Sequence, residues 1–442
     1  MKFKKIILPL LSIALFSSSE FALAEEQTEE SNEAEQVEAE DKENTDESNE
    51  ESDENTDDSE VNQDGQIEIE LDGPLRINQD QLLSMPSNFP TKLSYGPEAV
   101  VEYPEDGVKG IFATGPTVAT DRFDELIDLV NTTELNSMVV DVKEDNGDIV
   151  LDLDSDNELI NEATSAYADA EEVIQKLNEN DIYPIARVVV FKDSVLAEKR
   201  PDLSFVNQDG TVWKNGRNEA FVNPYEKEVW DYNIEVAKAA AELGFRDIQF
   251  DYVRFPEGFE YRDEELEYGR GDYDDSTTNV EQRIDSVNNF VEEARNQLLP
   301  YGVDVSVDIF GYAALVGEAP GIGQSFLGIS ENVDVLSSMI YPSHWGPGSF
   351  GIDKPDLEPY NVVDQYMKLE NELIAEIGDD APQSRPWIQD FTASYLGSGN
   401  YLNYGAHEVT EQIRAIHDNG VDEFLLWNSA NRFSEDATFS FD

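Results

Sequence analysis

The stretch of sequence that decides the fold reads Asp247-Ile248-Gln249-Phe250-Asp251-Tyr252-Val253-Arg254-Phe255, a short apolar run that carries acidic residues. Seven more runs of this kind occur along the chain, and a helix-length segment separates each from the next. They cover residues 107–114, 137–143, 183–191, 304–310, 333–341, 386–391 and 423–428. Eight strand–helix repeats within residues 107–442 match the count and size of a closed parallel barrel. The sequence therefore predicts an α/β fold, a (β/α)8 TIM barrel.

Polar and charged residues cluster where most of the runs end, and barrels of this type carry their chemistry at those strand ends. Two connections on that side, residues 256–278 and 343–361, are too long for simple turns. Loops of this length usually form lids or binding walls, and the second one carries His344 and Trp345. Among the connecting helices, Asn223 followed by Pro224 predicts a helix start, and Gly244 predicts its end.

The first 24 residues have the three parts of a secretory signal peptide. Three lysines precede an apolar run over residues 6–16, and Ala22-Leu23-Ala24 closes the segment, so cleavage is expected after Ala24. A retained membrane anchor is the alternative, but it needs about 20 apolar residues, and residues 17–20 interrupt this run. The chain has no Cys, which removes both a lipoprotein anchor and disulfides. We expect a protein that is secreted or associated with the cell surface, with no stable membrane insertion after cleavage.

Residues 25–60 form an acidic segment in which 19 of 36 residues are Asp or Glu and none is aromatic. Such a composition cannot bury enough apolar surface to fold, so the sequence predicts a disordered spacer. A calcium-buffering or partner-binding tail is the alternative for a charge run of this kind. Residues 61–106, which are rich in proline, are expected to form an N-terminal extension that packs on the barrel.

The acidity continues in the rest of the chain, since residues 61–442 hold 25 Lys and Arg against 76 Asp and Glu, a net charge of −51. This balance disfavours nucleic acid as a partner, because phosphates require basic patches. It also disfavours docking on an anionic membrane. An acidic surface stays soluble at high salt, where its self-repulsion is screened, which fits a salt-tolerant source.

Three of the predicted strands place acids inside the barrel, because successive strand side chains point to opposite faces. In residues 247–255 the apolar set of Ile248 and Phe250 should face the helices, which leaves Asp251 in the lumen. The same alternation in residues 304–310 puts Asp308 inside. In residues 137–143 it puts both Asp141 and Lys143 inside. A cluster of acids at a barrel mouth often marks a site with tuned pKa values.

Each of these acids also has a purely structural interpretation, in which it pairs with a neighbouring cation. Asp141, for example, could pair with Lys143 or Arg187. Several buried carboxylates together are harder to explain in this way, since each costs several kcal/mol without compensation. Gln389 and Asp390 have opposite phases, so only one of the two can face the lumen squarely.

The available residue types narrow the chemistry. With three His and no Cys, the chain offers little for a transition-metal centre, and we expect neither a metal nor another cofactor. It contains no Gly-rich phosphate loop and no Gly-x-Ser-x-Gly elbow. Paired carboxylates and aromatic walls remain, and these are the equipment of glycoside hydrolysis. Tyr341, Trp345 and Trp427 lie near strand ends, where they could stack on sugar rings or simply pack.

The chain resembles a family of glycoside hydrolase-like barrel proteins of bacterial envelopes, first catalogued as a domain of unknown function. The resemblance spans about residues 107–428 and rests on the following motifs: Gly107-Val108-Lys109-Gly110-Ile111-Phe112, Val140-Asp141-Val142-Lys143, Phe250-Asp251-Tyr252-Val253-Arg254-Phe255-Pro256, Met339-Ile340-Tyr341-Pro342-Ser343-His344-Trp345 and Trp387-Ile388-Gln389-Asp390-Phe391. The third string is the most specific and is similar to the strand-four signature of related glycosidase-like barrels. The resemblance implies that Asp251 is the nucleophile. It implies no particular acid and no defined substrate.

Our leading hypothesis is a secreted, monomeric enzyme that hydrolyses O-glycosidic bonds of an envelope or extracellular polysaccharide. Asp251 would be the nucleophile, Asp308 the general acid and base, and Asp390 the reserve acid. The expected substrate-binding residues are Asp141, Lys143, Arg187, Arg254, Tyr341, His344, Trp345, Gln389 and Trp427. A glycan-binding barrel without catalysis, tethered at the cell surface, is the alternative. A deacetylase is a third hypothesis, which the small number of His residues disfavours.

Overall fold

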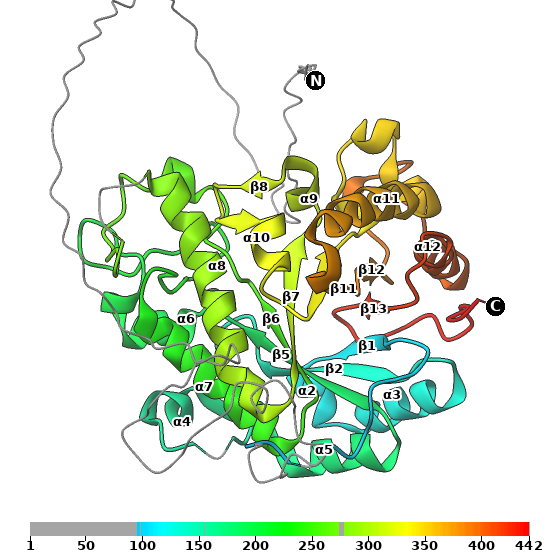
Figure 1. The fold of residues 1–442 in the computed structure, drawn as a ribbon, viewed down its shortest axis with the longest axis horizontal. Coiled ribbons are helices and arrows are strands. Elements are labelled where there is room, and N and C mark those ends of the chain that lie inside the picture. Colours follow the sequence, from blue (N-terminus) through cyan, green and yellow to red (C-terminus); the bar gives the residue numbers. More distant parts are fainter. Residues whose placement is uncertain (1–94, 98, 154, 274–277, 442) are drawn as a thin grey trace, which may run out of the picture. The chain divides into compact units, whose positions relative to one another are not determined.

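Eight parallel strands close into a barrel in which each barrel strand pairs with the barrel strands before and after it in the chain (Figure 1). Strand β13 pairs with β1 and completes the ring. The barrel strands are β1 (Lys109–Ala113), β2 (Ser137–Lys143), β5 (Tyr183–Val189), β6 (Asp247–Asp251), β7 (Asp304–Phe310), β10 (Val335–Met339), β12 (Trp387–Gln389) and β13 (Phe424–Trp427). Each lies within one predicted run, so the predicted (β/α)8 barrel is confirmed.

This computed structural model describes residues 95–97, 99–153, 155–273 and 278–441. The predicted signal peptide, the acidic segment and residues 61–94 of the extension lie outside the described residues. Within the described part of the chain, no helix combines the length and the apolar character needed to cross a membrane.

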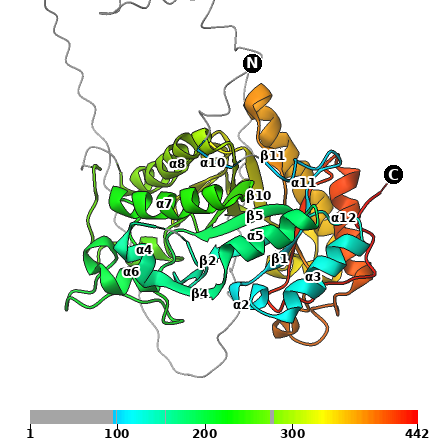
Figure 2. The same cartoon turned by 90° about the horizontal axis from the view of Figure 1, so that it is seen from below.

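Helices connect the strands and cover the outside of the barrel. The longer ones are α3 (Asp121–Thr132), α5 (Ala170–Glu179), α7 (Lys227–Leu243), α8 (Asn279–Leu298), α11 (Pro359–Ile377) and α12 (Ala406–Asp418). Helices α7 and α8 lie side by side on one flank, and α11 and α12 lie together on the opposite flank (Figures 1 and 2). The predicted start of α7 at Asn223 is wrong by a few residues, because Asn223 caps the turn at Tyr225 instead. Gly244, at φ 117°, ends the helix as predicted.

Smaller elements decorate the ends of the barrel. The short helices are α2 (Gly115–Val118), α4 (Glu158–Ala163), α6 (Ser194–Lys199), α9 (Tyr312–Val316) and α10 (Phe326–Ser330). The additional strands are β3 (Ile149–Leu151), β4 (Thr164–Ala168), β8 (Glu318–Ala319), β9 (Gln324–Ser325) and β11 (Gln383–Ser384). Short 3-10 helices cover Pro201–Leu203, Phe259–Tyr261, Leu299–Tyr301, Pro342–His344, Ser349–Gly351, Pro355–Leu357, Gly378–Asp380 and Ser394–Leu396.

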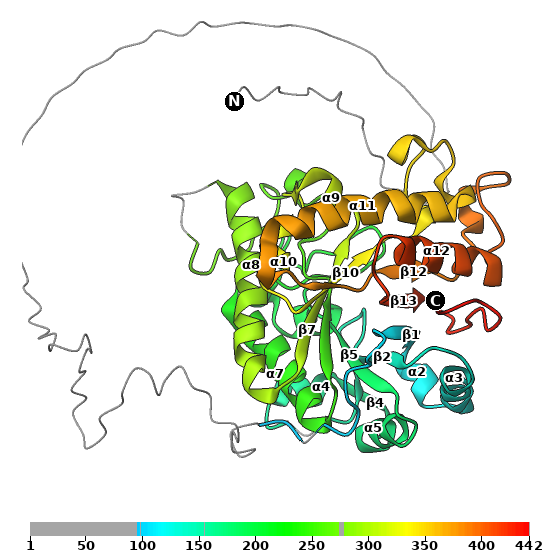
Figure 3. The same cartoon turned by 45° about the vertical axis from the view of Figure 1, so that its right-hand side comes forward.

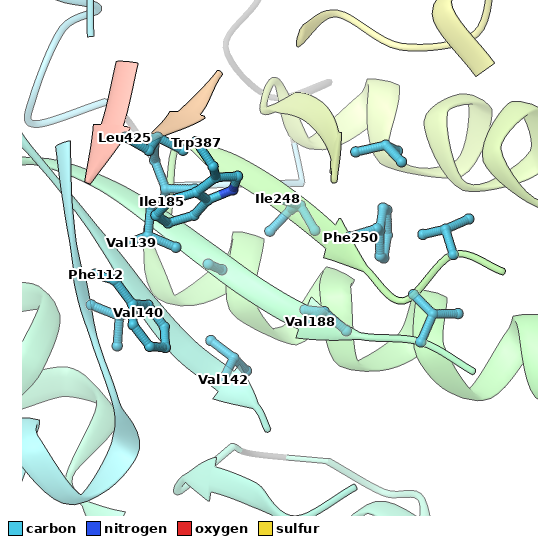
Figure 4. Packing of buried hydrophobic residues seen from close by; sticks show 14 of the residues in the cluster. Phe112, Val139, Val140, Val142, Ile185, Val188, Ile248, Phe250, Trp387 and Leu425 are labelled. Atoms are coloured by element: carbon cyan, nitrogen blue, oxygen red, sulfur yellow. The ribbon is translucent and has the colours of Figure 1, made fainter. Parts of the chain in front are cut away.

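The buried apolar residues of the strands and helices form one cluster, and Figure 4 shows part of it around the barrel strands. Phe250, for example, packs edge-on against Phe290 of α8, so its side of β6 faces the helices. The next residues along the strand, in either direction, therefore point into the lumen. This confirms the predicted phase of strand β6 and fixes where Asp251 points.

Buried charges close the N-terminal end of the barrel. Arg385 donates hydrogen bonds to Asp247 at 2.7 Å, to Glu423 at 2.8 Å and to the Tyr103 hydroxyl at 3.0 Å. The Tyr103 ring packs edge-on against Tyr183. Each of the three partners accepts a hydrogen bond from the guanidinium. These bonds offset the free-energy cost of burying its charge. Figure 3 shows β13 beside β1, and the parallel pairing of these two strands closes the ring.

Candidate active site at the C-terminal end of the barrel

Asp251 and Asp308 are neighbours on adjacent parallel strands. The residues just before them, Phe250 and Val307, are Cα partners in the pairing of β6 with β7. Both acids follow an outward-facing residue, so both point into the lumen, and both are at least nine-tenths buried. The lumenal phase predicted for these two acids therefore agrees with the register, which places them side by side at the mouth of the barrel.

Arg187, on strand β5, joins three carboxylates around Asp251. Its Nε and Nη2 lie 3.0 and 2.6 Å from Asp251 Oδ2, its Nη1 lies 2.8 Å from Asp141 Oδ1, and its Nη2 lies 2.7 Å from Asp145 Oδ1. The guanidinium also lies over the rings of Phe112 and Trp427, at 5.5 and 5.6 Å from their centroids. The two rings and three acids fix its plane and hence the orientation of Asp251.

Burial decides the protonation of Asp141. Although Arg187 acts in the opposite direction, burial raises the pKa of Asp141 to about 7. Asp141 lies in the lumen, as the alternation along the strand predicts. It also pairs with Arg187, as expected for an acid with a structural role. Its contacts give it the role of a support for the guanidinium.

The backbone after Asp251 is held in an unusual conformation. Tyr252 has φ 52°, in the left-handed region that bulky residues rarely adopt. Its N–H donates to Asp251 Oδ1 at 2.6 Å, while its ring lies under the ammonium of Lys192 at 4.6 Å. Strain of this kind costs about 1–3 kcal/mol and collects at functional sites. The result is that each oxygen of Asp251 has a fixed donor.

Asp308 is the acid with the shifted pKa. Its Oδ1 accepts a hydrogen bond from Trp387 Nε1 at 2.8 Å, and no described residue bonds its Oδ2. Burial and then the charge of Asp251 raise the pKa of Asp308 well above its ordinary value. A neutral acid beside a carboxylate that is held by a guanidinium is the arrangement that general acid catalysis requires.

Aromatic and polar side chains from the later strands complete the mouth. Trp427 stacks on Phe112 with ring centroids 4.4 Å apart, at the C-terminal end of β13. Tyr341 lies against His344 and Phe391, with centroids at 5.1 and 5.9 Å. His344 is exposed to solvent.

Arg254 lies between two rings at the mouth. Its guanidinium is 4.9 Å from the centroid of Tyr252 and 4.6 Å from that of Phe310. It donates to the carbonyl of Phe255 at 3.1 Å and makes a longer contact of 3.4 Å with Glu257. Arg254 is therefore held by two ring faces and by the carboxylate of Glu257.

Lys143 is not in the lumen, which corrects the sequence prediction. A register shift between Asp141 and Lys143 marks a bulge in β2, and the bulge turns Lys143 toward the helices. Its Nζ lies 2.7 Å from Asp193 Oδ2 and 2.9 Å from Asn233 Oδ1 of α7. Lys143 is fully buried between barrel and helix, so it does not reach a substrate at the mouth.

Three further residues also lie away from the position that the prediction gave them. Both oxygens of Asp390 accept hydrogen bonds from Ser434, from its N–H and its hydroxyl, so Asp390 fastens the C-terminal segment and is not a reserve acid. Gln389 takes the lumenal phase, but its amide is used to hold Ser343 and Asp356. Trp345 packs on Phe350 and on Tyr366 of α11, and its buried Nε1 has no hydrogen bond among the described residues.

Sequence reasoning missed the cation that supports the other side of the mouth. Lys192 follows strand β5 and lies 2.9 Å from Asp145 Oδ2, 2.9 Å from Glu219 Oε1 and 3.3 Å from the Tyr252 hydroxyl. A long connection follows β5, residues 190–226, and bridges such as Lys192 with Phe221 and Ser204 with Val222 give it order. The position of Lys192 and Asp145 just after strand ends is the signal that could have identified them.

Two solved structures are similar to this chain. A hypothetical protein from Ruminiclostridium thermocellum ATCC 27405, of solved structure, is 35% identical over 45% of this chain and 96% of that chain, with a TM-score of 0.39. The PgaB (BpsB) glycoside hydrolase domain from Bordetella bronchiseptica shares the fold at 14% identity, covering 74% of this chain and 95% of that chain, with a TM-score of 0.51.

A search of curated proteins finds no match. The family described as "Putative glycosyl hydrolase domain" matches residues 110–433. This range includes all eight barrel strands except Lys109, the first residue of β1, and it includes both Asp251 and Asp308. The chain belongs to this glycosyl hydrolase family.

Proposed function

We propose that the protein is a secreted glycoside hydrolase that cleaves O-glycosidic bonds of an extracellular or cell-envelope polysaccharide, with Asp251 as nucleophile and Asp308 as general acid and base. The observation that carries this proposal is the adjacency of the two acids on β6 and β7, together with the raised pKa of Asp308. The family match supports a reaction on carbohydrate. The signal-like first 24 residues support export.

The mechanism follows from what each group can do. Asp308, held protonated, gives its proton to the glycosidic oxygen as the bond to the leaving sugar breaks. Asp251 attacks the anomeric carbon and forms a covalent glycosyl ester. Asp308, now ionised, takes a proton from water, and this water hydrolyses the ester and returns Asp251 to its starting state.

The surrounding residues keep the nucleophile in place. The contacts of Arg187 and of the Tyr252 N–H orient Asp251 toward the mouth, so little reorganisation is needed when the bond forms. Trp427 offers an aromatic face beside this pair for a sugar ring.

The strand geometry favours retention of configuration. Neighbouring strands lie about 4.8 Å apart, and side chains at paired positions of one face keep a similar spacing. Retaining enzymes have carboxyl groups about 5–5.5 Å apart, whereas inverting enzymes need about 6.5–9.5 Å to admit a water. The product of cleavage should therefore keep the anomeric configuration of the substrate.

The test is an incubation of the full chain with wall and exopolysaccharide fractions of the source organism at high salt, with new reducing ends counted. We expect the wild type to release them and Asp251→Asn to lose at least about 100-fold in rate. Asp304→Asn is the matched control, since Asp304 is an acid at the opposite end of strand β7 and bonds Tyr183. Glycan binding by both wild type and Asp251→Asn, with no reducing ends from either, would replace the proposal by a glycan-binding barrel.

A further inference from the structure

Tyr341 is a nearly buried tyrosine whose hydroxyl has no hydrogen-bond partner among the described residues, although only 6% of the residue is exposed. Two other buried tyrosines show the usual situation, whereas the hydroxyl of Tyr366 in α11 also lacks a partner among the described residues. The hydroxyl of Tyr183 bonds Asp304 and that of Tyr225 bonds Asn279. Burying a hydroxyl without a partner opposes folding, so such a group calls for an explanation.

Tyr341 lies on the side of β10 that faces the acids, because Ser337 pairs with Asp308 and Tyr341 follows Ser337 at the same alternation. Tyr341 lies just beyond the C-terminal end of β10, and its ring contacts His344 and Phe391, which also contact each other. Burial, then Asp308, then Asp251 raise the pKa of Tyr341 well above its ordinary value, so the hydroxyl keeps its proton and remains a donor.

Two polar atoms at the mouth of the barrel lack a hydrogen bond and are not fully enclosed by protein. Asp308 Oδ2 and the Tyr341 hydroxyl each lack a hydrogen bond within the described chain, and neither belongs to the fully enclosed atoms that lack a partner. Both atoms therefore touch the open space at the mouth of the barrel. One is a carboxyl oxygen able to carry a proton, and the other is a neutral donor beside it.

We propose that Tyr341 is a catalytic residue that donates its hydroxyl hydrogen bond to an oxygen of the sugar unit held between Asp251 and Asp308. This inference rests on the proposed function. It gives the substrate as the hydrogen-bond partner that the Tyr341 hydroxyl lacks within the described chain. The acceptor is a hydroxyl or carbonyl oxygen of that sugar, because the Tyr341 hydroxyl, which keeps its proton, is the hydrogen-bond donor of this side chain. Hydrogen bonds of this kind strengthen as the transition state forms.

Tyr341→Phe removes only the unpartnered hydroxyl, which gives a test in two parts. The thermal midpoint of the full chain should stay unchanged or rise. Tyr225→Phe, which loses its bond to Asn279 outside the lumen, should lower the midpoint. In the hydrolysis assay Tyr341→Phe should lower kcat/KM by 10- to 100-fold, mostly in kcat, and Tyr225→Phe should stay within about twofold of the wild type per folded molecule.

The outcomes separate this inference from the proposed function. A fall of the midpoint in Tyr341→Phe equal to that in Tyr225→Phe would show an internal partner and overturn the inference, whatever the substrate. Wild-type kcat/KM in Tyr341→Phe would also overturn it. If none of the polysaccharide preparations yields reducing ends, binding provides the test. The affinity for the wall polysaccharide is then compared between the wild type and Tyr341→Phe. A five- to tenfold weaker binding by the variant supports the sugar contact, and equal binding overturns it.

Discussion

Arg187 and Asp251 form the central contact of the site, with two nitrogens of the guanidinium directed at one carboxylate oxygen at 3.0 and 2.6 Å. The same guanidinium serves Asp141 and Asp145, so one cation balances three acids. The stacked rings of Phe112 and Trp427 lie beside the guanidinium, 5.5 and 5.6 Å from it. Stability and the orientation of the nucleophile therefore depend on one residue.

Arg187→Met should destabilise the protein by about 3–5 kcal/mol at pH 7, because it leaves buried carboxylates without their cation. Hydrolysis per folded molecule should fall as well, since Asp251 loses its fixed orientation. Urea unfolding measures the first effect. Arg295→Met is the control, because Arg295 pairs with Asp334 at a partly exposed position, where a pair contributes at most about 1 kcal/mol. Equal losses in the two variants would contradict the central role of Arg187.

Asp141→Asn tests the protonation of the lumen. The folded pKa of Asp141 is about 7 against 3.8 for the free side chain, so folding binds a proton between these values. The resulting stability is present at low pH and is lost as the pH rises toward 7. Asn has no such titration. The urea stability of wild type minus that of Asp141→Asn should therefore fall between pH 4 and pH 8, by about 4 kcal/mol on the linkage scale. A difference that grows with pH would contradict the raised pKa.

Asp308→Asn tests the general acid. Because burial and Asp251 raise the pKa of Asp308, the rate should decline on the alkaline side as the proton is lost. The variant should lose about 10²- to 10⁴-fold in kcat and should lack that alkaline decline. The loss should be smaller for an aryl glycoside with an activated phenol, which leaves without a proton. A variant that keeps the alkaline decline would assign it to another group.

Salt should stabilise this chain. Its formal net charge is −67, and the self-repulsion of exposed acids is screened as the Debye length falls from about 10 Å at 0.1 M salt to 3 Å at 1 M. The thermal midpoint should rise by about 5 °C between 0.1 and 2 M NaCl, a shift that corresponds to one or two kcal/mol for a domain of this size. Sucrose at matched osmolality separates screening from solute exclusion. A falling midpoint would mean that ion pairs such as Arg187 with Asp251 outweigh the repulsion.

The strands were predictable from sequence because a parallel barrel buries each strand on both faces, and a continuous apolar run is a strong signal. The inward phase of Asp251 and Asp308 followed from simple alternation, since Ile248, Phe250 and Val307 mark the outer face without ambiguity. That the two acids are adjacent could not be predicted in the same way. It follows from the register of β6 with β7, which depends on pairing between segments distant in sequence.

The failures have local causes. A bulge in β2 breaks the alternation just after Asp141, and sequence alone gives no sign of it. Asp390 lies at a strand end like a catalytic acid, but Ser434, 44 residues later, occupies its carboxylate. Trp345 lies in a loop that packs onto α11, where it contacts Tyr366. The length of the loop does not indicate against which element the loop packs.

Lys143→Met tests the corrected position of Lys143 between barrel and helix. Removing the ammonium leaves Asp193 as a buried charge without its cation, which should cost about 3–5 kcal/mol in urea unfolding. The double variant Lys143→Met with Asp193→Asn should recover part of this loss, because the second change removes the unpaired charge. Hydrolysis per folded molecule should stay within about twofold of the wild type in both, since Lys143 faces Asn233 of α7 and not the mouth. A Lys143→Met protein with wild-type stability and lost hydrolysis would instead return Lys143 to the substrate side of strand β2.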